Sequence, residues 1–134
     1  MLVRRAKELQ PTAEVSLTTN GLGLDKIAAS LAEAGLDRIN ISLDSVRPAD
    51  FHTITRRDRL EDVLAGISAA QDAGLSPVKI NAVLLRGIND DQAVELLDWC
   101  ISRNLELRFV EQMPLDAQHS WSRAMMITAQ EIFE

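Results

Sequence analysis

The sequence predicts an α/β fold in which about four parallel βα units form part of a (β/α) barrel. Two observations predict the units: apolar residues at helical spacing alternate along the chain with short strand-like runs, and similar helix-end segments recur between them. A third observation favours a barrel over an open sheet, because each predicted strand has one apolar and one largely polar face. We therefore expect right-handed βαβ connections, with helices outside and polar side chains inside.

The recurring segments mark where predicted helices end and strands begin. "AEAGLDRINIS" at 32–42 resembles "AQDAGLSPVKINAV" at 70–83, and "SRNLELRFVEQM" at 102–113 is a weaker copy. Each has a residue suited to the left-handed conformation just past a helix, followed by a leucine that can pack back on that helix. These pairs are Gly35 and Leu36, Gly74 and Leu75, and Asn104 and Leu105.

This pattern assigns the predicted elements in order. Strands are predicted at about 14–19, 38–44, 77–85 and 105–111, and helices at about 2–9, 24–34, 60–73 and 90–102. Asn89 or Asp90 is expected to cap the last of these helices. Thr128 and Glu131 have capping-box spacing, so another helix is predicted to begin there. Because both ends of the sequence read as helices under way, we expect residues 1–134 to form a single fragment inside a longer protein.

Composition excludes several classes of function. The chain has 134 residues, a size typical of one domain, and no apolar run long enough for a membrane span. Its net charge of −6 argues against nucleic-acid or membrane-surface binding, and we expect a cytoplasmic protein. The single cysteine, Cys100, allows neither an internal disulfide nor a cysteine-ligated cluster built from this chain alone.

The polar face carries the candidate ligand groups. Lys79 and Arg108 fall on this face of neighbouring strands in an otherwise acidic protein, which favours an anionic ligand such as phosphate or carboxylate. The alternative is that the face is the solvent side of an open sheet and that Lys79 pairs with Asp44 or Glu106. The pattern alone leaves both possibilities open.

Four motifs carry a resemblance to a known family. "LTTNG", "RINISLDS", "VKINAVLLRGIND" and "LRFVEQMPLD" occur in an order and spacing similar to those of the molybdenum-cofactor biosynthesis protein A family. That family consists of radical S-adenosylmethionine (SAM) lyases that act as GTP 3′,8-cyclases and carry [4Fe–4S] clusters. The resemblance implies a three-quarter (β/α)6 barrel whose lumen holds SAM and GTP.

Residue by residue, the resemblance assigns binding roles on the polar face. It implies GTP contacts at Thr18, Lys79 and Arg108, and SAM contacts at Ser42 and Met113. It assigns no catalytic residue and no metal ligand here, because the family's CxxxCxxC and GGE motifs and its C-terminal cysteines are absent. We therefore expect this chain to be the middle of a cyclase, without the N-terminal cluster-binding part and the C-terminal domain, and to be inactive alone.

Two other functions are compatible with the residues. Lys79 could form a Schiff base in an aldolase built on a (β/α) barrel. A non-catalytic half-barrel could instead self-associate, because four strands leave two open sheet edges, so a homodimer or higher assembly is predicted.

Overall fold

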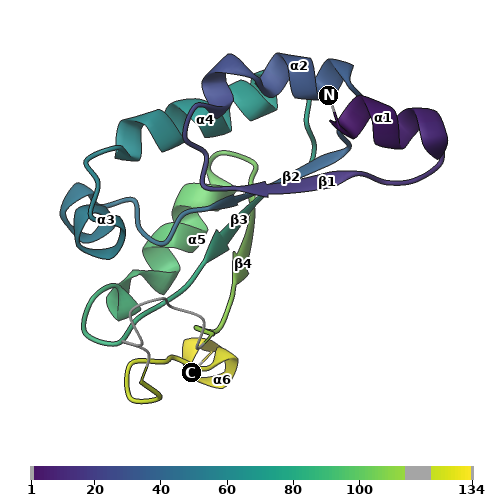
Figure 1. Cartoon of the computed structure of the whole chain (residues 1–134). Coiled ribbons are helices and arrows are strands. Elements are labelled where there is room, and N and C mark those ends of the chain that lie inside the picture. Colours follow the sequence, from purple (N-terminus) through teal and green to yellow (C-terminus); the bar gives the residue numbers. More distant parts are fainter. Residues whose placement is uncertain (1, 114–121, 134) are drawn as a thin grey trace.

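The structure, a computed structural model, describes residues 2–113 and 122–133 (Figure 1). Its strands are β1 (Ser16–Thr19), β2 (Arg38–Ser42), β3 (Val78–Ala82) and β4 (Glu106–Phe109). Its α-helices are α1 (Leu2–Leu9), α2 (Ala28–Glu33), α3 (Pro48–Thr55), α4 (Leu60–Asp72), α5 (Ala93–Ile101) and α6 (Ala129–Phe133). Two 3₁₀ helices, η1 (Leu24–Lys26) and η2 (Asp90–Gln92), precede α2 and α5.

The strands form one parallel sheet in the order β1-β2-β3-β4. Consecutive strands are therefore neighbours, as in successive βα units of a barrel wall. Figure 1 shows α2, α4 and α5 along one side of this sheet. The predicted α/β class with about four parallel units is confirmed.

The predicted helix-end motif is present at all three positions. Gly35, Gly74 and Asn104 have φ angles of 92°, 79° and 54°, in the left-handed region. The leucine N–H that follows each of them donates to a carbonyl in the last helical turn, as in Leu36 to Leu31 at 3.0 Å. These leucines are buried, so each motif ends a helix and fixes the start of the next strand.

The core lies on the helix side of the sheet. Ile39, Ile41 and Ile80 are fully buried there and pack with residues of α2 and α4. A second apolar cluster beyond the ends of β3 and β4 contains Leu84, Leu96 and Ile127. Alternation along each strand therefore places the intervening side chains on the opposite face.

Some predicted elements differ from the structure. The strands are shorter than predicted, because several flanking residues belong to the connections. The eight-residue α3, with Pro48 in its first turn, was not predicted. Its only buried residue is Phe51, so it lacks the apolar periodicity that marks the longer helices.

Asn89 occupies the N-cap position that was predicted for Asn89 or Asp90, at the start of η2. It does not cap through its side chain, which makes no capping hydrogen bond. Its amide is fully buried and instead bonds to backbone groups of Leu85, Val83 and Asp44. Satisfying several buried backbone groups at once outweighs satisfying one helical N–H.

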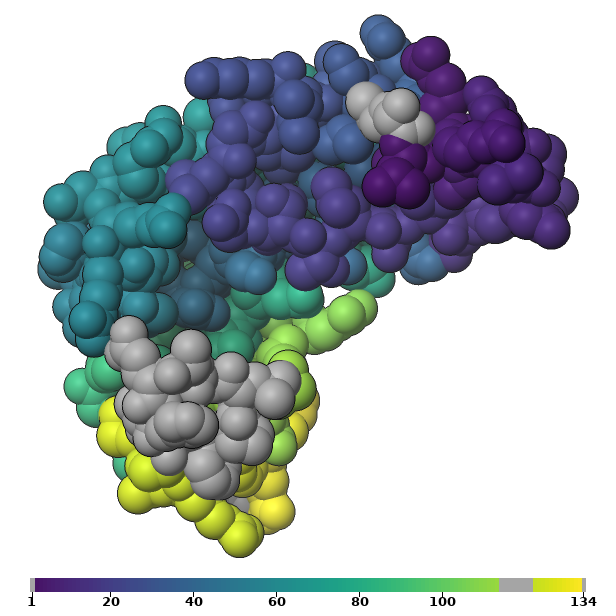
Figure 2. Space-filling view, viewed as in Figure 1, coloured from purple at the N-terminus to yellow at the C-terminus, as the bar shows by residue number. Residues whose placement is uncertain are grey.

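The segment that ends in α6 packs near the carboxyl end of the sheet. The predicted capping box is confirmed, because the Thr128 N–H donates to Glu131 and the Glu131 N–H donates to the Thr128 hydroxyl. Arg86 pairs with Glu131 at 2.6 Å and so ties this segment to the loop after β3. Figure 2 shows a curved molecule with the N-terminal elements at one end of the arc and this segment at the other.

Candidate functional site

The polar face of the sheet is arranged in rows across the strands. Strand register aligns Asn40 with Lys79, and Ser42 with Asn81. One row thus runs through Thr18, Asn40, Lys79 and Glu106. The next row toward the carboxyl ends contains Ser42, Asn81 and Arg108. The structure therefore brings Thr18, Ser42, Lys79 and Arg108 together on one face, as predicted.

Lys79 has a partner of its own in the first row. Its Nζ lies 2.7 Å from Glu106 Oε2, and the exposed fractions of the two side chains are 17% and 55%. The possibility of pairing with Glu106 is thus realised, whereas pairing with Asp44 is not. Strand register places this carboxylate directly beside Lys79, so the charge of Lys79 is compensated without a ligand.

The second row contains polar groups that have no partner among the described residues. Arg108 is exposed, and its guanidinium has no ion pair or hydrogen bond within the described residues. The neighbouring Asn81 has a buried Oδ1 that accepts no hydrogen bond from any residue in 2–113 or 122–133. Because a buried unsatisfied acceptor is costly, the middle of this row suits a polar ligand or ordered water better than an apolar one.

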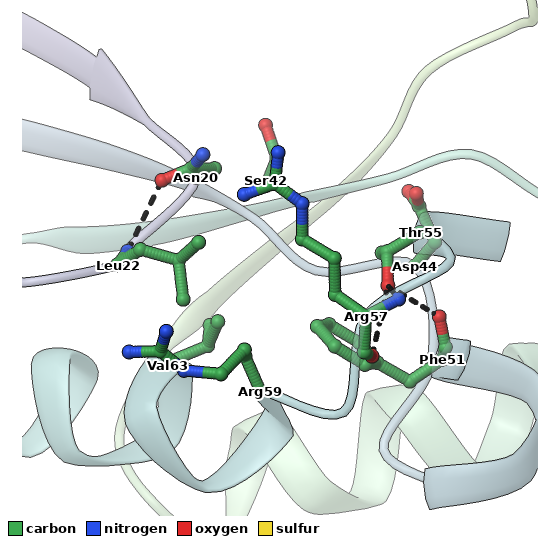
Figure 3. Close-up of a pocket in the computed structure, with 9 residues that line it drawn as sticks. All are labelled: Asn20, Leu22, Ser42, Asp44, Phe51, Thr55, Arg57, Arg59 and Val63. Carbon is green, nitrogen blue, oxygen red and sulfur yellow. Dashed lines mark hydrogen bonds between the residues drawn. The ribbon is translucent and has the colours of Figure 1, made fainter.

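A cavity of about 150 Å³ opens at the carboxyl ends of β1 and β2 (Figure 3). Its polar wall includes Asn20, Ser42 and Asp44 from the strand ends, and Arg57 and Arg59 from the loop before α4. In Figure 3 the Arg57 side chain extends from its loop across the cavity in the direction of Ser42. Carboxyl ends of parallel strands are where such folds collect ligand groups.

The two arginines of this cavity differ. Arg59 bonds to Asp62 in the first turn of α4, so its charge is neutralised locally. The Arg57 guanidinium has no partner within the described ranges 2–113 and 122–133. An exposed guanidinium that lines a cavity can bind a carboxylate or a phosphate bidentately.

Backbone turns fix the first wall of the cavity. The Thr19 hydroxyl accepts from the Gly21 N–H at 3.2 Å, and Asn20 Oδ1 accepts from the Leu22 N–H at 3.1 Å. Gly21 has a φ of 80°, and a Cβ there would meet Val63 at 3.0 Å, so glycine suits both the turn and the packing. The "TTNG" motif thus shapes the strand end as well as carrying Thr18, whose hydroxyl accepts from Asn40 at 3.2 Å.

Asp44 and Asn89 join the ends of β2 and β3. Asp44 Oδ1 accepts from the Val83 N–H at 2.8 Å, and Asn89 Nδ2 donates to the Asp44 carbonyl at 2.8 Å. Burial raises the pKa of the Asp44 carboxyl above its usual range, against the opposing effect of the Val83 N–H. These bonds hold the strand end that carries Ser42 in place.

Sequence analysis identified the polar face but gave Arg57 no role. Residues 55–59 are mostly exposed and carry no apolar periodicity that would have marked them. The available signal was the position of Arg57 in the connection after the second strand, since such loops border the ligand side of a barrel. Met113, predicted to contact SAM, lies beyond β4 with 60% of its surface exposed.

The residues present do not fit an iron–sulfur cluster. Cys100 is fully buried on α5, and burial raises the pKa of its thiol to about 11. The described residues include no group of three or more histidine, cysteine or acidic side chains placed to bind a metal ion. In the same ranges, no helix has the length and apolar character needed to cross a membrane.

Comparison with known proteins finds closely similar relatives, among them three bacterial proteins. Each is named GTP 3′,8-cyclase: those of Streptomyces coelicolor and Mycolicibacterium smegmatis are 56% identical, and that of Paenarthrobacter nicotinovorans is 55% identical. The similarity covers 98–99% of this chain but only 37–38% of each relative. The chain thus spans a little over a third of the length of these proteins.

A family model described as the radical SAM superfamily matches residues 1–100. This range contains β1 to β3 with Thr18, Ser42 and Lys79, the cavity at the strand ends, and most of α5. The match agrees with the parallel sheet, its outer helices and its open polar face. The chain therefore belongs to the radical SAM superfamily.

Proposed function

We propose that this chain is the middle part of a GTP 3′,8-cyclase and that it supplies lumen residues for GTP and SAM. The complete enzyme would convert GTP to (8S)-3′,8-cyclo-7,8-dihydroguanosine 5′-triphosphate in molybdenum cofactor biosynthesis. The observation that carries the proposal is the polar face. There Lys79 and Arg108 lie on the neighbouring strands β3 and β4, in adjacent rows that also contain Thr18 and Ser42. The names of the relatives support the same activity.

The nucleotide is assigned to the rows that contain the two cations. Lys79 and Arg108 would share the negative charge of the triphosphate, and Thr18 would contribute its hydroxyl. Arg108 is available because none of the described residues pairs with it. Charge-assisted contacts of this kind contribute roughly 1.5–3 kcal/mol each.

SAM is assigned to the cavity at the strand ends. Ser42 would hold it through its hydroxyl, the Arg57 guanidinium would complement the carboxylate of its methionine moiety, and Asn20 would offer a polar contact. Met113 follows β4 and would approach SAM through its backbone. When bound beside a reduced cluster, SAM supplies the radical that begins the reaction. This chain's residues would bind and orient the two ligands.

The cluster must be held by cysteines outside this chain. A single buried thiol whose pKa is about 11 cannot supply three thiolates. We therefore propose that residues 1–134 form a single fragment of the catalytic core, inactive without the remainder. The Schiff-base aldolase alternative finds no support, since the relatives carry a different activity.

Two further parts of this proposal concern the chain's surroundings. The outer edges of β1 and β4 pair with no other strand of the described residues. Open edges of this kind favour a homodimer or higher assembly when the chain is isolated. A cytoplasmic location completes the proposal.

The proposal is tested by anaerobic iron–sulfur reconstitution followed by a GTP-cyclisation assay. The longer protein that contains this sequence should bind a cluster and convert GTP, whereas residues 1–134 alone should do neither. Turnover by residues 1–134 alone, or a cluster-loaded longer protein that leaves GTP unchanged, would contradict the proposal.

A further inference from the structure

Glu106 is a carboxylate at a site otherwise suited to an anion. It lies on β4 in register with Lys79, and its Oε2 is 2.7 Å from the Lys79 ammonium. Arg108 projects from the same face of the same strand and has no partner among the residues described. Lys79 is therefore neutralised by the chain itself, whereas none of the residues that the structure describes neutralises Arg108.

We propose that Glu106 is a built-in counter-ion that competes with the bound polyanion for Lys79 and thereby limits nucleotide affinity. This inference rests on the function proposed above. Glu106 is a positioning residue, because it acts through Lys79. When a triphosphate approaches, Lys79 can satisfy the ligand only by giving up or sharing its contact with Glu106.

The exposures of the two side chains set the direction of the exchange. Lys79 is 17% exposed and hence largely confined to the sheet surface, whereas Glu106 is 55% exposed. The carboxylate can swing into water at little cost, so ligand binding is expected to move Glu106 and leave Lys79 in place. A carboxylate that remained near the phosphates would repel them, and the repulsion would grow with ligand charge.

The inference predicts that removing this carboxylate strengthens nucleotide binding. Glu106→Gln keeps the size and polarity of the side chain but removes its charge. We expect the affinity for GTP to rise about two- to fivefold, the range expected for one partly exposed ion pair. The gain should be smaller for GMP, absent for SAM, and reduced at high salt because the interaction is electrostatic.

The experiment is calorimetric titration of the longer enzyme with GTP, GMP, inorganic tripolyphosphate and SAM. Glu33→Gln, an exposed site on α2, is the control for the loss of one negative charge, and Glu106→Asp is the control that retains the charge. Glu33→Gln should bind GTP as the unmodified enzyme does, and Glu106→Asp, which retains the charge, should gain less affinity than Glu106→Gln. A gain that depends on phosphate charge and is largest in Glu106→Gln would support the inference.

Other outcomes overturn the inference. Unchanged GTP affinity in Glu106→Gln would show that Lys79 is released at no cost. Weaker binding would show that Glu106 orients Lys79 for the ligand, and weaker binding only with Mg²⁺ present would show that Glu106 holds the nucleotide's metal ion. If the unmodified enzyme bound neither GTP nor tripolyphosphate, the proposed function itself would fail, which keeps the two failures distinct.

Discussion

The two faces of the sheet come from the same strands but differ in burial and polarity. On the helix side, Ile39, Ile41 and Ile80 are fully buried in the apolar core. On the other side, Lys79, Asn81 and Arg108 alternate with them and remain partly or largely exposed. The first face holds the fold together by burial, and the second carries groups whose partners are in part missing from the described chain.

The comparison predicts that stability is concentrated on the helix side. Ile41→Ala should lower the free energy of unfolding by about 2–5 kcal/mol, because it opens a cavity in a fully buried site. Asn40→Ala, at the adjacent position on the polar face, should cost about 1 kcal/mol, the value of its hydrogen bond to Thr18. Urea unfolding of both variants measures the difference. Equal losses of unfolding free energy would show that stability is not concentrated on the helix side.

Ligand binding should show the reverse pattern. Arg57→Gln in the longer enzyme is expected to weaken SAM binding about tenfold, because one charge-assisted contact is lost. Arg59→Gln is the matched control, since Arg59 is already engaged by Asp62. Both sites are exposed, so unfolding midpoints should hardly move. If the two variants bound SAM equally well, Arg57 would not bind the carboxylate of SAM in this cavity.

The polar face should also contribute a pH dependence through Asp44. Burial raises the pKa of this carboxyl in the folded state above 3.8, so the folded state binds its proton more tightly than the unfolded state. That stabilisation is fully present below pH 3.8 and is lost as the pH rises through the folded-state pKa. Asp44→Asn stays neutral and can still accept from the Val83 N–H.

Unfolding free energies of Asp44→Asn and the unmodified chain should therefore diverge with pH. The variant should gain relative stability as the pH rises from 3 to 7, with Asp98→Asn, at an exposed site on α5, as the charge control. A difference that stayed constant over this range would show that the Asp44 carboxyl is ionised in the folded state as readily as in the unfolded one.

The smallest effect is expected at the far end of the molecule. The Thr128 N–H, the Arg86 guanidinium and the Thr128 hydroxyl together lower the pKa of Glu131 to about 2. Glu131 therefore stabilises the start of α6 above its usual pKa of 4.5, and this contribution is lost as the pH falls toward 2. Glu131→Gln should increase amide exchange within α6 and leave exchange in β3 unchanged; an α6 as protected as before would contradict this role.

The difference between the faces also explains what the sequence could predict. Alternation in "RINIS" and "VKINA" is enough to assign the apolar face, because burial depends on residue type and period alone. The helix-end motif at Gly35 and Gly74 was equally predictable, because the positive φ angle that it needs depends only on the residue at that position. Prediction of the parallel sheet and its faces therefore succeeded.

The parts that sequence reasoning missed depend on contacts between distant segments. Asn89 was expected to cap a helix but bonds to Asp44 and Val83, which only the paired strand ends bring near. Arg57 belongs to a loop whose direction no periodicity encodes. The choice between Glu106 and Asp44 as the partner of Lys79 was left open and required the strand register to decide it.

The central claim is that Lys79 serves a polyanionic ligand on the open face and is more than a structural cation. The most direct test is calorimetric titration of Lys79→Ala in the longer enzyme with GTP and, separately, with SAM. We predict GTP binding weakened about ten- to a hundredfold by loss of the charge-assisted contact, with SAM binding little changed. Unchanged GTP affinity, or an equal loss for both ligands, would contradict the account and leave Lys79 as the partner of Glu106 alone.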